Sequence, residues 1–135
     1  MIRIDHYNVL IADDEYMVRQ SVSRRIAEID DSFRIAAECQ DGKEALQALE
    51  GGNIQVVITD IRMPEMDGLE LAKQIHEQYP EILTVILTGY ADFEYAQEAI
   101  RQGVSHNTDL CQFFGWGSNT ITFLEAQVGH VANSR

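Results

Sequence analysis

Acidic side chains cluster at two places in the sequence, and their chemistry suggests a phosphoryl-transfer site. Asp13, Asp14 and Glu15 follow one apolar run, and Asp60 ends another. Carboxylates held close together repel one another, so either protons or a cation must compensate. Oxygen ligands of this type suit Mg²⁺, and a carboxylate beside Mg²⁺ can attack phosphorus to form an aspartyl-phosphate. A hydroxyl such as that of Thr88 can donate to the phosphoryl oxygens.

Strands and helices must bring these groups together. Short apolar runs predict strands at residues 9–12, 33–39, 56–60 and 82–88. Apolar residues at helical spacing follow each run, around residues 18–29, 46–49, 69–79 and 91–102. Four strands that each precede a helix predict an α/β fold, a doubly wound parallel sheet covered on both faces. Because the carboxyl ends of such strands line the functional crevice, the acids and Thr88 are expected to converge there.

The second and third helices carry start signals. Asp41 precedes Glu44 by three positions and Asp67 precedes Glu70 by three, which is the form of a capping box. Pro80 is expected to end the third helix.

Each candidate residue also has a simpler interpretation. Asp13 and Asp14 can serve only to favour a helix N-terminus. Asp60 can be an ordinary acid of a loop, and Thr88 with Gly89 can be a turn. Their joint occurrence at the ends of three strands favours a common site.

Composition restricts the class of protein. The chain has 135 residues, enough for one domain with a buried core, and a net charge of −12. This charge argues against direct nucleic-acid binding, since phosphate contacts rely on Lys and Arg. No apolar run approaches the length of a membrane span, and no secretory signal opens the chain. Cys39 and Cys111 lack CxxC or zinc spacing, which predicts reduced thiols and a cytoplasmic location.

Three segments carry a resemblance to a known family: VLIADDE at residues 9–15, VVITDIRMPEMDGLEL at 56–71 and VILTGYADFEYAQEAIRQGV at 85–104. They resemble the receiver domain of two-component response regulators over most of the chain. The last segment is most similar to receivers attached to transcription regulators of the AraC type. The resemblance implies a flavodoxin-like fold with strand order 2-1-3-4-5.

The resemblance also implies roles for individual residues. Asp60 matches the phosphoacceptor, which takes a phosphoryl group from the phosphohistidine of a sensor histidine kinase. Asp13 and Asp14 match the acidic pair that holds Mg²⁺, with Asp14 the more direct ligand and Asp13 acting more through water. The backbone carbonyl of Arg62 matches a further protein ligand of the metal, beside Asp60.

Thr88 matches the switch hydroxyl that moves toward the phosphoryl oxygens, and Pro64 and Gly68 match the loop that shapes the pocket. No residue is predicted to bind an organic cofactor. The implied protein is a signalling domain and not an enzyme in the usual sense, although it takes part in its own phosphoryl transfer and hydrolysis. The transcriptional output that it normally controls is expected to lie outside this chain.

The resemblance stops abruptly, which predicts a receiver core at residues 1–104 and an atypical segment at 105–135. In the family, a fifth strand with an aromatic switch residue leads into a lysine-proline pair. Asn107, Leu110 and Cys111 stand at those three places here. No lysine or proline follows residue 80, so a shift of register does not restore the pair.

The fifth strand and the last helix are therefore in doubt. A frame change or an artefact in the encoding DNA is the leading hypothesis for the atypical segment, and genuine divergence is the rival. Without the lysine, the carboxylates lack a nearby cation from the fifth strand, which predicts a stronger dependence on Mg²⁺ and a raised pKa of at least one carboxylate in the metal-free protein. Coupling to the far face is expected to be weak, and the usual dimerisation surface compromised.

Two other classes of protein share parts of this pattern. A Mg²⁺-dependent phosphohydrolase with an aspartyl-phosphate intermediate commonly has a second acid two residues after its nucleophile, and Arg62 stands there. A flavin-binding electron carrier needs a loop that cradles phosphate after the first strand, and the acids of residues 12–15 would repel phosphate. Both features favour the signalling domain.

Overall fold

The computed structural model describes residues 7–29, 32–88 and 108–112. In chain order, its elements are β1 (Tyr7–Ala12), α1 (Tyr16–Ile29), β2 (Phe33–Cys39), α2 (Gly42–Glu50), β3 (Val56–Asp60), α3 (Gly68–Gln78), β4 (Leu83–Thr88) and β5 (Thr108–Gln112). Strands and helices alternate as far as β4, as the sequence predicts. The predicted helix at residues 91–102 lies outside the described residues, as does most of the segment after residue 104.

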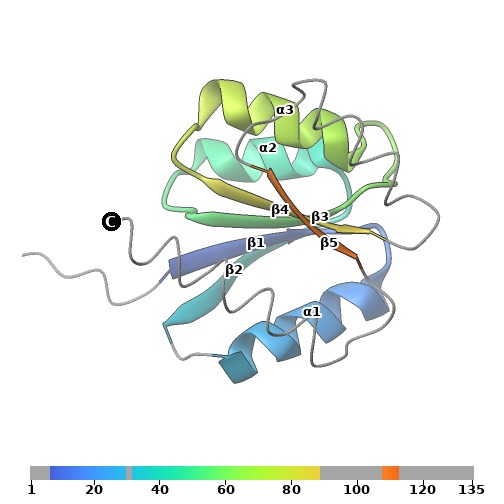
Figure 1. Ribbon diagram of the computed structural model, residues 1–135, viewed down its shortest axis with the longest axis vertical. Helices are drawn as coiled ribbons and strands as arrows, with labels where there is room; N and C mark the ends of the chain where they lie inside the picture. Colours follow the sequence, from blue (N-terminus) through green and yellow to red (C-terminus); the bar gives the residue numbers. More distant parts are fainter. Residues whose placement is uncertain (1–6, 30–31, 89–107, 113–135) are drawn as a thin grey trace, which may run out of the picture.

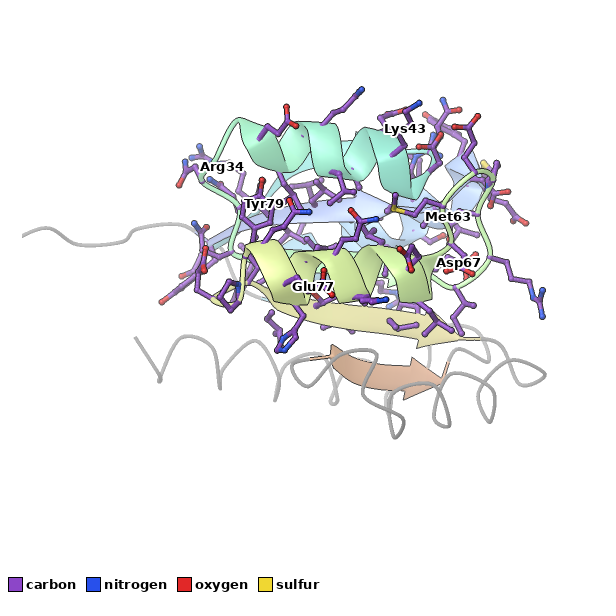
Figure 2. The ribbon with its side chains drawn as sticks, turned by 90° about the horizontal axis from the view of Figure 1, so that it is seen from above. Arg34, Lys43, Met63, Asp67, Glu77 and Tyr79 are labelled. Atoms are coloured by element: carbon purple, nitrogen blue, oxygen red, sulfur yellow. The ribbon has the colours of Figure 1, made fainter. Side chains whose placement is uncertain are left out.

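The five strands form one parallel sheet in the order β2-β1-β3-β4-β5. Figure 1 shows α1 on one face of this sheet and α2 with α3 on the other. Seen from above in Figure 2, α2 and α3 lie side by side over the sheet. This is the predicted flavodoxin-like, doubly wound arrangement, and it makes the carboxyl ends of β1 and β3 neighbours.

Side-chain alternation divides the core into two layers. On β1, Val9 and Ile11 pack in the layer that contains the buried residues of α1, whereas Leu10 and Ala12 pack in the layer under α2 and α3. None of these four side chains is more than 1% exposed. Because both faces of the sheet are covered, its central strands are continuous apolar runs, which is why the sequence revealed them. Cys39 belongs to the second layer as a buried free thiol.

The helix starts follow the predicted capping pattern. The Asp41 carboxylate accepts a hydrogen bond from the Glu44 amide at 2.8 Å, and the Asp67 carboxylate accepts one from the Glu70 amide at 2.9 Å. Such caps satisfy backbone donors that have no partner within the helix. Helix α3 ends at Gln78, before Pro80.

Two strand limits differ from the sequence prediction. β1 begins at Tyr7 instead of Val9, and the Tyr7 ring stacks on Phe33 of β2 with 5.4 Å between centroids. This cross-strand aromatic pair extends β1 beyond its apolar run. β4 begins at Leu83, one residue later than predicted.

The sequence analysis placed the fifth strand in doubt, and this was wrong, because the backbone forms that strand. Thr108–Gln112 pairs in parallel with β4, with Thr84 opposite Thr108 and Thr88 opposite Gln112. A strand ladder is built from backbone groups, so it forms without the lysine-proline signature. Leu110 and Cys111, which stand where that pair was expected, lie within β5.

Candidate functional site

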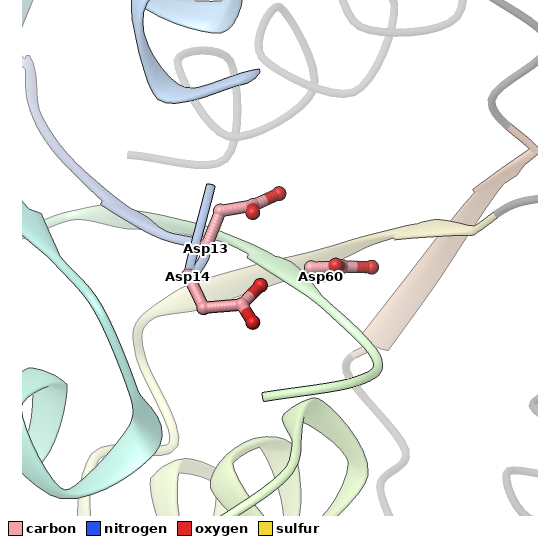
Figure 3. A group of neighbouring side chains, drawn as sticks. All are labelled: Asp13, Asp14 and Asp60. Carbon is pink, nitrogen blue, oxygen red and sulfur yellow. The ribbon is translucent and has the colours of Figure 1, made fainter. Parts of the chain in front are cut away.

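Three acids meet at the carboxyl ends of the two central strands. Asp60 is the last residue of β3, and Asp13 directly follows β1, with Asp14 next in the chain. Backbone pairing of Ala12 with Thr59 sets these two strand ends side by side. Figure 3 shows the three carboxylates gathered at this end of the sheet.

The acids are close enough to share one ion. A carboxylate oxygen from each of Asp13, Asp14 and Asp60 lies within 4.8 Å of the other two. Asp13 is only 6% exposed, Asp60 is partly buried and Asp14 is exposed. The cluster therefore has one buried wall and one side open to solvent.

Burial raises the pKa of Asp13 from 3.8 to about 6. A hydrogen bond from the Glu15 amide to Asp13 Oδ1, at 2.8 Å, opposes this rise. The negative charges of Asp60 and Asp14 add to it. Asp13 therefore carries a proton over part of the weakly acidic range when no cation is present.

The pKa of Asp60 is also raised, mainly by burial, while the Ile61 amide opposes the rise through a 2.8 Å hydrogen bond to Asp60 Oδ1. The charges of Asp14 and Glu15 raise it further. A raised carboxylate pKa agrees with the sequence prediction, but burial is its main cause, ahead of the carboxylate repulsion on which the prediction was based.

This donor set fits a hard divalent cation. All three side chains supply oxygen, the ligand atom that Mg²⁺ prefers, and their mutual repulsion is relieved by positive charge. An adjacent open pocket of about 410 Å³ is lined by Asp14, Ile61, Arg62, Met63, Pro64 and Asp67. Since a water molecule takes about 30 Å³ in the liquid, the pocket has room for the several waters that Mg²⁺ retains.

The loop after β3 is folded tightly against Asp60. The Gly68 amide donates to the Ile61 carbonyl at 2.7 Å, and a Cβ atom at position 68 would overlap the Asp60 carbonyl oxygen. Glu65 occupies the left-handed region with φ of 67°, which is strained for a residue with a side chain. Gly68 therefore lets α3 begin directly behind the acid, as expected of a loop that shapes the pocket.

The backbone places two other predicted site residues, Arg62 and Thr88, beside the acids. Arg62 lines the pocket, and its backbone amide hydrogen bonds to the Asp60 carboxylate. Leu87 is opposite Asp60 in the sheet, so Thr88 stands at the same edge as the acids. The Thr88 side chain lies outside the described residues.

Arg19 is a neighbour of the site that the sequence prediction missed. It is 8% exposed, and its guanidinium donates to the backbone carbonyl of Asp13 at 2.6 Å. A signal was available: Arg19, Val22 and Ile26 have the i, i+3, i+7 spacing of one helix face, which places an arginine on the buried side of α1.

Comparisons with known proteins agree with this geometry. Residues 9–107 match the family described as response regulator receiver domain. The transcriptional regulatory protein YesN of Bacillus subtilis, itself uncharacterized, is 36% identical over 100 residues, which are 74% of this chain and 27% of YesN. The DNA-binding transcriptional regulator NtrC of Escherichia coli K12 is 35% identical over 95 residues, 70% of this chain and 20% of NtrC. The chain thus spans less than a third of either relative.

A solved structure supports the same assignment. The REC domain of AraT, a response regulator from Geobacillus stearothermophilus, is 33% identical and superposes with a TM-score of 0.77 over 95% of this chain and 96% of that domain. A signal receiver domain from Pseudomonas fluorescens, 22% identical with a TM-score of 0.80 over 100% of this chain and 96% of that one, shares the fold.

The chain belongs to the response regulator receiver domain family of two-component systems. It is a phosphoacceptor domain, which overturns the phosphohydrolase alternative, and it is a signalling domain rather than a classical enzyme. Membership of this family implies a histidine kinase as partner in general. None of the helices described is long and apolar enough to span a bilayer.

Proposed function

We propose that Asp60 accepts the phosphoryl group from the phosphohistidine of a sensor histidine kinase. Mg²⁺ would be held by Asp13, Asp14, Asp60 and the backbone carbonyl of Arg62. The observation that carries this proposal is the cluster of three carboxylates within 4.8 Å, with Asp60 at the end of the central strand.

Asp60 has the position that a nucleophile needs. One carboxylate oxygen forms the new bond to phosphorus as the phosphorus–nitrogen bond of the phosphohistidine breaks, and the imidazole leaves with the electron pair. The amides of Ile61 and Arg62 orient the Asp60 carboxylate. A bound Mg²⁺ supplies positive charge that keeps the acids ionised and offsets charge on the phosphoryl oxygens. Transfer from small phosphodonors and later hydrolysis are catalysed by the domain itself.

Thr88 is proposed as the switch hydroxyl, because the end of β4 stands beside Asp60 in the sheet. β5 carries Leu110 and Cys111 where the family has its lysine-proline pair. No lysine from β5 then balances the phosphoryl charge, which supports weak coupling to the far face and a compromised dimerisation surface. By sequence, residues 1–104 would be the receiver core and 105–135 an atypical segment, although β5 of that segment completes the sheet.

We also propose an output and a cellular location for the whole regulator. YesN and NtrC are described as transcriptional regulators, which supports a transcriptional output in a part of the regulator that this chain does not include, of the AraC type on the sequence resemblance. The net charge of −12 supports an indirect link to DNA through that output. Kinase partnership and two-component signalling support a cytoplasmic location.

Incubation with acetyl phosphate and Mg²⁺, followed by intact-mass measurement, tests the acceptor. Wild-type protein is expected to gain one phosphoryl group, and Asp60→Asn none. Asp41→Asn is the matched control, because it removes one carboxylate while asparagine still caps α2. A folded wild-type protein without an adduct, or an Asp60→Asn protein that keeps it, would refute the proposal.

The atypical segment has its own test in the encoding DNA. The frame-change hypothesis expects that another frame encodes a lysine-proline strand followed by a helix beyond residue 104. If neither other frame does, the frame-change hypothesis fails.

A further inference from the structure

Arg19 of α1 ties together the ends of two strands. Its Nη1 donates to the Asp13 carbonyl at 2.6 Å, and its Nε lies 3.4 Å from Glu38 Oε1 on β2. The Glu38 contact is an ion pair by distance only, since Arg19 Nε has no hydrogen-bond partner among the described residues. Gln20 also donates to Glu38 Oε1, at 3.0 Å. The hydrogen bond to Asp13 is therefore the directed contact of the guanidinium.

The guanidinium is shielded from solvent. The Arg19 side chain is only 10% exposed, and its Cζ lies 5.6 Å from the centre of the Tyr16 ring. Burying a charge is costly unless it is paired and hydrogen bonded. The shielding also strengthens a charge-assisted hydrogen bond, because water does not compete for the carbonyl.

The main chain of Asp13 is consequently held on both sides. Its amide donates to the Cys39 carbonyl at 3.0 Å, and its carbonyl accepts from Arg19. With both groups fixed, the peptide that joins Asp13 to Asp14 has a set orientation. That peptide joins the Cα atoms of both acids, so its orientation limits the directions in which their carboxylates can point.

We infer that Arg19 is a positioning residue that holds the Asp13–Asp14 peptide so that both carboxylates face Asp60. The inference rests on the proposed function, because it takes these acids to be the Mg²⁺ ligands. Arg19 touches neither the ion nor the phosphoryl group and acts only through the backbone. Groups that orient metal ligands in this way change metal affinity when they are removed.

A purely structural role predicts a different result. If Arg19 served only to join α1 to β2, its loss would lower stability and leave the Mg²⁺ affinity of the folded protein unchanged. The positioning role instead links Arg19 to the affinity for Mg²⁺ and to the rigidity of the loop after β1. The amide of Glu15, which donates to Asp13 Oδ1 at 2.8 Å, reports on that loop.

The test compares Arg19→Met, Arg19→Lys and the control Arg25→Met with wild-type protein. Arg25 lies on the same helix, and its ion pair with Glu28, at 3.7 Å, is remote from the acids. Calorimetric titration of metal-free protein with Mg²⁺ gives the dissociation constant. Hydrogen exchange at the Glu15 amide, measured without metal, gives the order of the loop.

Arg19→Met is expected to raise the dissociation constant for Mg²⁺ about tenfold or more. Its Glu15 amide should exchange faster than in wild-type protein or Arg25→Met, and Arg19→Lys should be intermediate. Phosphorylation by acetyl phosphate should recover once Mg²⁺ is saturating, whereas a generally damaged domain would stay slow.

A folded Arg19→Met protein with wild-type affinity and wild-type Glu15 exchange overturns the inference. If that variant does not fold, Arg19→Lys decides by the same two measurements. If wild-type protein itself does not bind Mg²⁺, the proposed function fails, and Glu15 exchange alone decides whether Arg19 positions the loop.

Discussion

Asp13 is the residue at which burial and function conflict. It is 6% exposed and has carboxylates on either side, so its pKa is raised to about 6. Its carboxylate is fixed by the Glu15 amide instead of by a cationic side chain. In the metal-free protein, the folded state therefore binds a proton at Asp13 more tightly than the unfolded chain does.

This difference gives a pH-dependent stability. Because the pKa of Asp13 is higher in the folded state, its contribution to stability is complete below about pH 4 and is lost as the pH rises through about 6. Compared with wild type, metal-free Asp13→Asn should gain stability over this interval, by on the order of 1 kcal/mol per pH unit. Urea unfolding in EDTA at several pH values measures the difference.

The same series in Mg²⁺ is the control, since a bound cation removes the advantage of a neutral side chain. A stability difference between Asp13→Asn and wild type that stays constant from pH 4 to pH 6.5 would contradict the assigned cause.

Among individual residues, the three acids were predicted from the sequence, but the arginine that we infer to orient two of them was not. Asp13, Asp14 and Asp60 were predictable because each lies at the end of an apolar run, where parallel strands place functional groups. Arg19 was missed because an arginine on a helix is ordinarily solvated, and its burial depends on the Asp13 carbonyl and Glu38 from separate elements.

Among the secondary-structure elements, α3 has the tightest constraint. Its first residue, Gly68, sits against the Asp60 carbonyl, with its amide bonded to the Ile61 carbonyl. The Asp67 cap fixes the same end of the helix. The start of α3 and the end of β3 are thus one packed unit.

Gly68→Ala should push the start of α3 away from the end of β3. The added methyl group overlaps the Asp60 carbonyl oxygen, so either α3 or β3 must shift, at a cost of about 1–3 kcal/mol or more. Urea unfolding measures the loss, and the yield of phosphorylated protein should fall with it.

Gly51→Ala is the matched control for this substitution. Gly51 has φ of −69° at the end of α2, and the nearest atom to an added Cβ is 3.4 Å away. Alanine there should leave stability unchanged or slightly higher. Equal losses in the two variants would show that the close approach at Gly68 has no special cost.

Element boundaries were predictable where local chemistry sets them. β2 and β3 have the predicted limits, Phe33–Cys39 and Val56–Asp60. β1 and β5 differed because their limits depend on pairing with other strands: the Tyr7 ring stacks on Phe33, and the backbone of β5 pairs with β4. A single sequence does not display such long-range contacts.

At the scale of the whole molecule, the site forms only when the two central strands, β1 and β3, have paired. Asp13 and Asp60 come from different strands, and only the pairing of β1 with β3 brings them together. A ligand that binds the folded state alone stabilises it by mass action.

Mg²⁺ should therefore raise the melting temperature of the wild-type protein. At a concentration 100 times the dissociation constant, the gain in stability is about 2.7 kcal/mol. Asp60→Asn and Asp14→Asn should gain less, whereas Asp41→Asn should gain as much as wild type. Calorimetric scans with Mg²⁺ and with EDTA measure these shifts, and an equal gain in Asp60→Asn would place the ion elsewhere.

The pairing of β1 with β3 also has a consequence during synthesis of the chain. The Asn8 amide bonds to the side chain of Gln55, 47 positions later, where these two strands begin. A ribosome-bound chain that has emerged only through α2 holds Asp13 and Asp14 without Asp60. On the proposed function, a chain at that stage has no acceptor, so a histidine kinase cannot yet transfer a phosphoryl group to it.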